Sequence, residues 1–497
     1  MNAEYRAEKE ASVSFLGGGG IWEINYVTVI APVAAFLWAL LQTRQGFFKP
    51  YTIPAVFTDF LLHCGAILFA TTIYAGAPQA LLGLLLLPAT AVVLQPRVET
   101  RSTPKSRLEA YMESKPKDSD EPGPKADLDP LPIKPYITTY RGAMTIITCT
   151  SILAVDFKVF PRRFAKTESF GTSLMDLGVG SFVFAAGLVA ARQQLKAQRQ
   201  VTAVLQPILR WMPAYGLLTF FIGCVYECVL YFTPDLKSYI ILSARIPSNW
   251  VSQNREGLFS FVGYFAIFIA GMGTGLAILR RESHSGELED ETRDPLDEDD
   301  EWLADVLGSS DRSDITAGDQ DKKAPAQPKP KNKEKHPDPL GLIWIAQTYD
   351  DSVFLAKWTI IWFILCVWAM WHYGPHLFVS RRMASLAYIL WVCTFNTTQL
   401  LLFNLVERVM FPNVHQAKDM QTERQRVKDA TSWVMKLFNR NGLALFLQAN
   451  LLTGIINLTV KTLHMGDVQA MAILLGYVAT LCGVALALDH YDVSIKI

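Results

Sequence analysis

Asp156-Phe-Lys-Val-Phe-Pro-Arg-Arg-Phe-Ala-Lys166 separates two apolar runs of the chain, 146–155 and 174–191. A carboxylate, several cations and a proline therefore lie between two segments that are apolar enough to enter a bilayer. Pro161 cannot continue a helix, because it lacks an N–H and its ring clashes with the preceding turn. Ionisable groups at such a depth are costly and are usually functional. The stretch predicts a polar hairpin between two membrane-spanning helices.

The rest of the chain repeats the apolar pattern on either side of this hairpin. Of its 497 residues 51% are hydrophobic, and about 20 mainly apolar residues are enough to cross a bilayer. Backbone groups in lipid must be bonded within their own segment, so such windows form helices. The sequence predicts an all-α fold, a polytopic integral membrane helical bundle, and short amphipathic pieces near 234–250 and 411–438 could hide further spans. The eleven predicted spans are 24–42, 54–76, 78–95, 142–160, 175–191, 213–233, 258–280, 353–373, 384–406, 442–463 and 469–488.

Two charged segments divide the chain into membrane regions. Segments 96–137 and 281–340 combine dense charge with few apolar residues, so we expect disordered cytoplasmic linkers. The remaining regions are an N-terminal region with spans one to three, a region that contains the hairpin, and a C-terminal membrane region. They cover 1–95, 138–280 and 341–497, respectively.

The charge of the loops predicts an orientation, because Lys and Arg collect in cytoplasmic loops. Loop 192–210 carries four cations and no acid, and loop 407–440 is basic on balance. An odd number of spans, with the N-terminus outside and the C-terminus in the cytoplasm, satisfies this distribution. The hairpin then lies on the non-cytoplasmic side despite its cations, which suggests a task other than setting the topology.

Composition argues against several classes of function. Lys and Arg together number 46, as do Asp and Glu, and no basic helix or finger motif suggests a nucleic-acid partner. The seven cysteines all lie in apolar runs without a Cys-x-x-Cys pair, so the sequence supports neither a metal site nor a redox cofactor.

The hairpin and the helix after it resemble an anion receptor. Ser173 can cap that helix, with Asp176 three residues further on, and a helix N-terminus favours anions. Arg162, Arg163 and Lys166 lie beside it, and guanidinium groups match the geometry of phosphate. We expect these residues to bind phosphates of a lipid headgroup or of a nucleotide-like carrier. The alternative is that the cations only contact lipid phosphates at the membrane surface.

Asp156 permits two interpretations. It can form an ion pair with Lys166 or an arginine, or it can act as a general base on a hydroxyl group. A close cation weakens a carboxylate as a base, but a thioester donor is already activated and needs only modest help. Lys166 can then stabilise the developing oxyanion.

Further polar groups are weaker candidates for substrate binding. Asn254 and Arg255 open a span and either line a headgroup pocket or cap the helix. Asn450 lies within a span, where interhelical hydrogen bonding is the alternative role. Asp59 and His63 are four residues apart on one helix and can pair with each other.

Five long motifs stand out in this sequence. They are YRGAMTIITCTSILAVDFKVFPRRFAKTESFGTSLMDLGVGSFVF (140–184), NREGLFSFVGYFAIF (254–268), HYGPHLFVSRRMASLAYILWV (372–392), FNTTQLL (395–401) and NRNGLALFLQANLLTGIIN (439–457). They resemble the inositol acyltransferases of glycosylphosphatidylinositol (GPI) anchor synthesis, the family of GPI-anchored wall transfer proteins. The resemblance covers essentially the whole chain except the two linkers. One departure is Ala185-Ala186, where the family pattern leads us to expect Ser or Asn, with an effect on packing more than on chemistry.

The resemblance implies a membrane-bound O-acyltransferase of the endoplasmic reticulum with thirteen spans, two more than we count. It implies transfer of a fatty acyl group, typically palmitoyl, from palmitoyl-CoA to the inositol 2-hydroxyl of glucosaminyl-phosphatidylinositol. Acyl-CoA is then a co-substrate, membrane lipids surround the protein, and no cofactor is needed. Asp156 and Lys166 match the catalytic pair of the family. CoA is cytoplasmic while the hairpin is predicted to be luminal, and a cavity passing between helices would reconcile the two.

Two other functions remain open from sequence. A lipid transporter or flippase would use the buried charges as a translocation path. A non-catalytic scaffold of the GPI pathway would use the charged linkers as docking tails.

Overall fold

The computed structural model describes residues 3–95, 129, 131–197, 212–279, 351–373, 379–415 and 419–493. These ranges consist of helices and connecting turns, and the only β-type pairing within them is an isolated bridge between Gly18 and Thr172. The predicted linker 281–340 lies wholly outside the described residues, and 96–137 lies mostly outside them.

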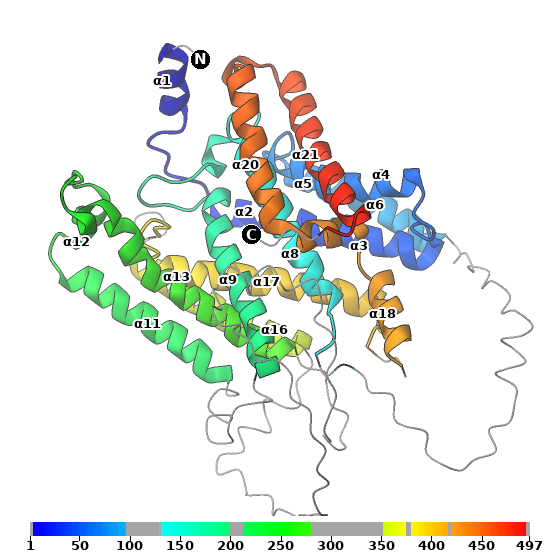
Figure 1. Ribbon diagram of the computed structural model, residues 1–497. Coiled ribbons are helices and arrows are strands. Elements are labelled where there is room, and N and C mark those ends of the chain that lie inside the picture. The colour runs from blue at the N-terminus through cyan, green and yellow to red at the C-terminus, as the bar shows by residue number, and fades with distance from the viewer. Residues whose placement is uncertain are drawn as a thin grey trace, which may run out of the picture.

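The helices follow one another along the chain with short connections (Figure 1). The first half contains α1 (Ala3–Ser12), α2 (Ile21–Thr28), α3 (Ile30–Leu40), the π-turn η1 (Leu41–Gln45), α4 (Ile53–Phe60), the π-turn η2 (Leu61–Gly65), α5 (Ala66–Thr71), α6 (Pro78–Leu94), α8 (Pro135–Ala154), the 3-10 turn η3 (Arg162–Phe164) and α9 (Leu174–Ala197). The second half contains α11 (Met212–Phe232), α12 (Leu236–Ile241), α13 (Trp250–Ile278), α16 (Asp351–Tyr373), α17 (Leu386–Met410), α18 (Met420–Asp429), α19 (Trp433–Arg440), α20 (Gly442–Thr459), the 3-10 turn η5 (Thr462–His464) and α21 (Asp467–His490).

The predicted polytopic helical membrane fold is confirmed. Every one of the eleven predicted windows overlaps a helix or a run of consecutive helices. Nine helical segments of the described chain are long and apolar enough to cross a membrane. The remaining two windows correspond to α6, which has 17 residues, and to α8, whose arginine and threonines lower its hydropathy. The short pieces that could have hidden further spans fold as α12, α18 and α19, which have only 6, 10 and 8 residues.

Helix α8 lies at the centre of the bundle. It packs against α17, α19, α20 and α9, and Tyr140, Ala143, Ile146 and Leu153 on it are fully buried. The Tyr140 hydroxyl donates a hydrogen bond of 2.6 Å to Oδ1 of Asn396 on α17. Such a bond pins two helices together where lipid provides no competing partner. The helix ends at Ala154, earlier than the predicted span 142–160, because the polar hairpin begins at this point.

Glycines allow α9 and α13 to pack very closely. A methyl group at Gly271 of α13 would overlap the carbonyl oxygen of Phe184, and one at Gly187 of α9 would overlap that of Phe268. Helices in membranes associate through such small residues, because close backbone approach maximises van der Waals contact. The α9–α13 pair therefore fixes the position of α9, which begins directly after the hairpin.

Replacing Gly271 by valine should separate these two helices. We expect Gly271→Val to lower the free energy of unfolding by about 1–3 kcal/mol, because the added methyl groups overlap backbone rather than a movable side chain. Thermal unfolding of the detergent-purified protein measures the effect. Gly257→Ala on the same helix is the control, since no atom lies within 4 Å of the added carbon. Equal stability of the two variants would contradict this packing argument.

Candidate active site

Aromatic side chains anchor the hairpin between α8 and α9. Phe157, Phe160 and Phe164 are fully buried in the main core, and the rings of Phe160 and Phe164 meet edge to face at 5.9 Å. Burial of three large apolar side chains fixes the backbone of a segment that has little regular structure. The polar side chains between them are thereby held in defined directions.

Asp176 binds the end of the hairpin to the start of α9. Its carboxylate is fully buried and accepts hydrogen bonds of 2.8 Å from the hydroxyls of both Thr167 and Ser173. The Ser173 hydroxyl in turn accepts the backbone N–H of Asp176, which confirms the predicted cap. Arg381, from the turn before α17, completes the shell with an ion pair of 2.8 Å. Asp176 thus has a full set of protein partners, and it lies behind the cavity wall rather than on it.

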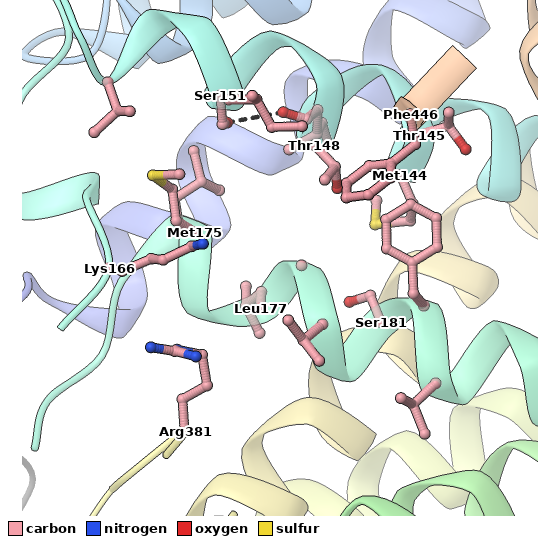
Figure 2. A pocket seen from close by; sticks show the side chains of 18 of the residues that line it. Met144, Thr145, Thr148, Ser151, Lys166, Met175, Leu177, Ser181, Arg381 and Phe446 are labelled. Atoms are coloured by element: carbon pink, nitrogen blue, oxygen red, sulfur yellow. Dashed lines mark hydrogen bonds between the residues drawn. The ribbon is translucent and has the colours of Figure 1, made fainter. Parts of the chain in front are cut away.

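A cavity of about 920 Å³ opens beside the hairpin. Figure 2 shows Lys166 and Arg381 at one side of it and Met144, Thr145 and Phe446 at the other. Its walls come chiefly from α8, α9 and α20, together with the hairpin and the turn before α17. The polar end is lined by Asp156, Lys166, Thr167, Glu168, Arg381 and Arg382, and apolar lining residues include Met144, Ile147, Ile152, Met175, Leu177, Val179, Phe182, Val183, Leu443 and Phe446.

Asp156 lies on the wall of this cavity and has a different ion-pair partner from those predicted. Its Oδ1 lies 2.9 Å from Nζ of Lys9 on α1, and its Oδ2 accepts a bond of 2.7 Å from the side-chain amide of Asn457 on α20. The predicted alternative of an ion pair between Asp156 and Lys166 is therefore wrong, because the cation that pairs with Asp156 is Lys9. Sequence could not have identified this partner, because Lys9 is 147 residues away in an unremarkable polar tail.

Lys166 also lines the cavity, and its ammonium group is easier to deprotonate than that of an ordinary lysine. Surrounding protein atoms desolvate the cation and lower its pKa, and the positive charge of Arg381 lowers the pKa further. The Asp176 carboxylate opposes both effects. The two predicted catalytic residues thus face one cavity, as the sequence interpretation required.

Three cations of the cavity, Arg141, Arg381 and Arg382, were missed by sequence reasoning. Arg381 and Arg382 precede α17 and lie on the wall beside Lys166. Arg382 makes a fork of two hydrogen bonds, 2.9 and 2.8 Å, to the Glu256 carboxylate, which raises the pKa of the guanidinium. Adjacent arginines within one of the family motifs were an available signal, but nothing in the sequence connects them to a hairpin 215 residues earlier.

The other two predicted hairpin cations, Arg162 and Arg163, do not line the cavity and have protein partners of their own. Arg162 donates to the carbonyl oxygen of Val155 at 2.5 Å. Burial lowers its pKa, while the Asp156 carboxylate raises it. Arg163 is exposed and forms an ion pair of 2.6 Å with Glu23. Direct substrate contact by either arginine stays a prediction.

Arg255 fastens the end of α12 and the turn after it. The buried Arg255 guanidinium donates to the carbonyl oxygens of Ile240, Ser243 and Ala244, and it stacks over the Tyr239 ring at 4.8 Å. The Asn254 amide donates to its own helix. Neither side chain lines the cavity, so the headgroup pocket predicted for them does not coincide with it.

The far end of the cavity reaches polar residues of α8, α19 and α20. Asn450 lines it while its amide donates to the carbonyl oxygen of Phe446. Arg141 and Asn439 line it as well, and both also border a second cavity of about 40 Å³ that contains Lys134 and Arg192. The Oδ1 atom of Asn439 is buried without a hydrogen-bond partner. Cations therefore lie at both ends of an apolar channel.

Ala185 and Ala186, the departure noted above, face this channel from α9. We expected them to affect packing more than chemistry. Their place in the lining means that their small size adds to the volume of the cavity.

The charge of Arg381 is predicted to control the protonation of Lys166. Because that charge lowers the pKa of Lys166, Arg381→Gln should raise it, and Asp176, freed from its partner, acts in the same direction. Labelling of Lys166 by an amine-reactive ester, followed by mass spectrometry across pH, should then have its midpoint at higher pH. Arg381→Lys keeps the charge and serves as control. An unchanged or lower midpoint in Arg381→Gln would contradict the assignment.

Comparison with known proteins places the chain in a family. The family model described as GWT1 matches residues 5–212 and 199–488. A protein of Gibberella zeae called GPI-anchored wall transfer protein 1 is 38% identical over 560 positions, which cover 100% of this chain and 99% of the relative. Proteins of the same name from Aspergillus fumigatus and Saccharomyces cerevisiae are 38% and 30% identical, with at least 99% of each chain covered. The family model covers nearly the whole chain, and the protein therefore belongs to the GWT1 family.

Proposed function

We propose that this protein acts in GPI biosynthesis as an acyltransferase. It moves a fatty acyl group, palmitoyl in the simplest case, from acyl-CoA to the inositol 2-hydroxyl of glucosaminyl-phosphatidylinositol. The name that its relatives share supports this pathway. The observation that carries the chemistry is one cavity with Asp156 and Lys166 at its polar end and an apolar channel leading away from them. The same pathway favours the endoplasmic reticulum membrane, and the charge of the loops favours a luminal N-terminus and a cytoplasmic C-terminus.

The shape and polarity of the cavity suit a lipid-like donor. Its volume of about 920 Å³ is at the upper end of the range of roughly 300–1,000 Å³ for ligand pockets. Met144, Phe182, Val183 and Phe446 are among the side chains that would contact a hydrocarbon tail. The carbonyl carbon of the donor then lies at the polar end, where the channel meets the hairpin.

The reaction exchanges a thioester for an oxygen ester. The inositol oxygen attacks the carbonyl carbon, the carbon–sulfur bond breaks, and CoA leaves as a thiolate that takes up a proton. Asp156 accepts or orients the hydroxyl proton, and Lys166 stabilises the negative charge that develops on the carbonyl oxygen. An ion-paired carboxylate is a weak base, which suffices because a thiolate is a good leaving group.

The cations at the two ends of the channel suit two anionic substrates. Arg381 and Arg382 lie beside Lys166 and can bind the phosphate of the lipid acceptor. Arg141 lies at the other end, where the second cavity continues towards Arg192 and Lys134. Cations at this end can hold a second anionic group.

The decisive experiment measures product formation. Purified protein is incubated with labelled palmitoyl-CoA and glucosaminyl-phosphatidylinositol, and the acylated lipid is quantified. We expect Asp156→Asn to lower kcat by roughly 10²–10⁴-fold, the usual contribution of a general base. Lys166→Ala should lower kcat by roughly 10²–10³-fold through loss of oxyanion stabilisation.

The outcomes separate the competing functions. An inactive wild-type protein that moves lipid between leaflets in vesicles would establish a transporter. A protein without either activity, whose partners are lost when 281–340 is deleted, would establish a scaffold. Active Asp156→Asn and Lys166→Ala variants would refute the site assignment and leave the enzyme intact.

A narrower channel should change the preferred chain length. Ala186→Phe places a larger side chain in the cavity. Each methylene group of the acyl chain that it displaces costs about 0.8 kcal/mol of binding free energy. Exclusion of two methylene groups therefore lowers kcat/KM for palmitoyl-CoA about tenfold, while lauroyl-CoA is affected less. Leu447→Phe on the exposed face of α20 is the control. A uniform loss for both donors would place the acyl chain elsewhere.

A further inference from the structure

The N-terminal segment 3–20 is built into the candidate active site. Helix α1 lies beside the upper ends of α20 and α21 in Figure 1. The buried Tyr5 hydroxyl accepts the backbone N–H of Leu463 at 3.0 Å, and its ring meets that of His464 edge to face at 5.4 Å. Glu8 forms a pair of 2.9 Å with the same histidine. Turn η5 therefore holds α1 in one orientation.

The end of the segment is fastened to the hairpin. The backbone N–H of Gly19 donates to the carbonyl oxygen of Thr172 at 2.7 Å, and the Thr172 hydroxyl donates to the carbonyl oxygen of Gly19. Gly18 and Gly171 both have positive φ, and a side chain on either would overlap the opposing backbone. Gly18 and Gly171 are thus required for this close approach. Between the two attachments, Val13 contributes to the cavity wall.

Lys9 connects α1 to Asp156 on the cavity wall. Its ammonium group lies 2.9 Å from Oδ1 of Asp156 and 2.8 Å from Oδ1 of Asn457. The Asn457 amide nitrogen donates to Oδ2 of Asp156 at 2.7 Å. The three side chains form a closed ring in which each Asp156 oxygen has one fixed donor. The ring also fixes the amide orientation, because only the oxygen of Asn457 can accept from an ammonium.

We propose that Lys9 is a positioning residue for Asp156 and that segment 3–20, attached at both ends, holds it in place. The proposal rests on the function proposed above. Only 19% of the Lys9 side chain and 13% of the Asp156 side chain are exposed, so water competes weakly for this pair. Each carboxylate oxygen keeps a further lone pair for the substrate hydroxyl. Lys9 and Asn457 thereby fix where that hydroxyl proton is received.

The charged and hydrogen-bonding neighbours of Asp156 determine the effect of removing Lys9. Lys9 reaches it from α1, Asn457 from α20, and Arg162 acts on it electrostatically from η3. Loss of the ammonium removes the closest cation and one of the two fixed donors. The carboxylate then gains rotational freedom. A merely structural lysine would change stability without changing kcat of the folded enzyme.

The test uses the full-length protein in the acyl-transfer assay with palmitoyl-CoA and glucosaminyl-phosphatidylinositol. We expect Lys9→Met to lower kcat about tenfold, a part of the contribution of a general base, with little change in KM for either substrate. Lys9→Arg should restore most of the lost kcat. Arg6→Met is the matched control, because it removes a cation of α1 that pairs only with the exposed Glu10.

The results distinguish failure of this inference from failure of the proposed function. If Asp156→Asn abolishes activity while Lys9→Met keeps the wild-type kcat, the positioning role is wrong and the function stands. A higher kcat in Lys9→Met also overturns the proposal, because Lys9 would then restrain the base. If Asp156→Asn is fully active, Asp156 is not the base and both assignments fall. Thermal unfolding of each variant shows that loss of rate does not reflect loss of fold.

Discussion

The buried carboxylate of Asp176 is the interaction on which the site depends. It joins the end of the hairpin through Thr167, the cap of α9 through Ser173 and the turn before α17 through Arg381. A fully buried charge is tolerated only when its hydrogen bonds are satisfied, and here all three partners come from different segments. Removing one would leave the others around an uncompensated charge. The arrangement therefore holds the arginine pair beside the hairpin at the polar end of the cavity.

Charge pairing recurs around the cavity and explains how cations persist there. Lys9 pairs with Asp156, Arg381 with Asp176, and Arg382 with Glu256. Each pair connects segments that are distant in the sequence, so the ionic contacts also determine tertiary structure. The apolar channel between α8, α9 and α20 lacks such pairs along its middle part and suits a hydrocarbon chain. One cavity thus combines a polar end for chemistry with an apolar part for a lipid.

Sequence reasoning succeeded where a property belongs to a contiguous segment. Apolar windows of sufficient length predicted the helices, because the cost of unpaired backbone groups in lipid leaves no other structure. Pro161 and the charges around it predicted the hairpin, and Ser173 predicted the start of α9. The boundary of α8 was less accurate, since hydropathy alone cannot tell the last residues of a helix from the apolar anchors of a turn.

The partners of the polar side chains were decided by tertiary structure. Composition could show that Asp156 needs a counter-charge, but Lys9, Lys166 and several arginines were equally eligible, and only the docking of α1 selects among them. The same holds for Arg381 and Arg382, whose place beside Lys166 depends on how α17 packs against α9. The sequence by itself determined a helical membrane protein with a polar hairpin, because transfer into lipid is a local energetic constraint. Which charges meet across the cavity is a long-range outcome of packing, and therefore only the folded chain reveals it.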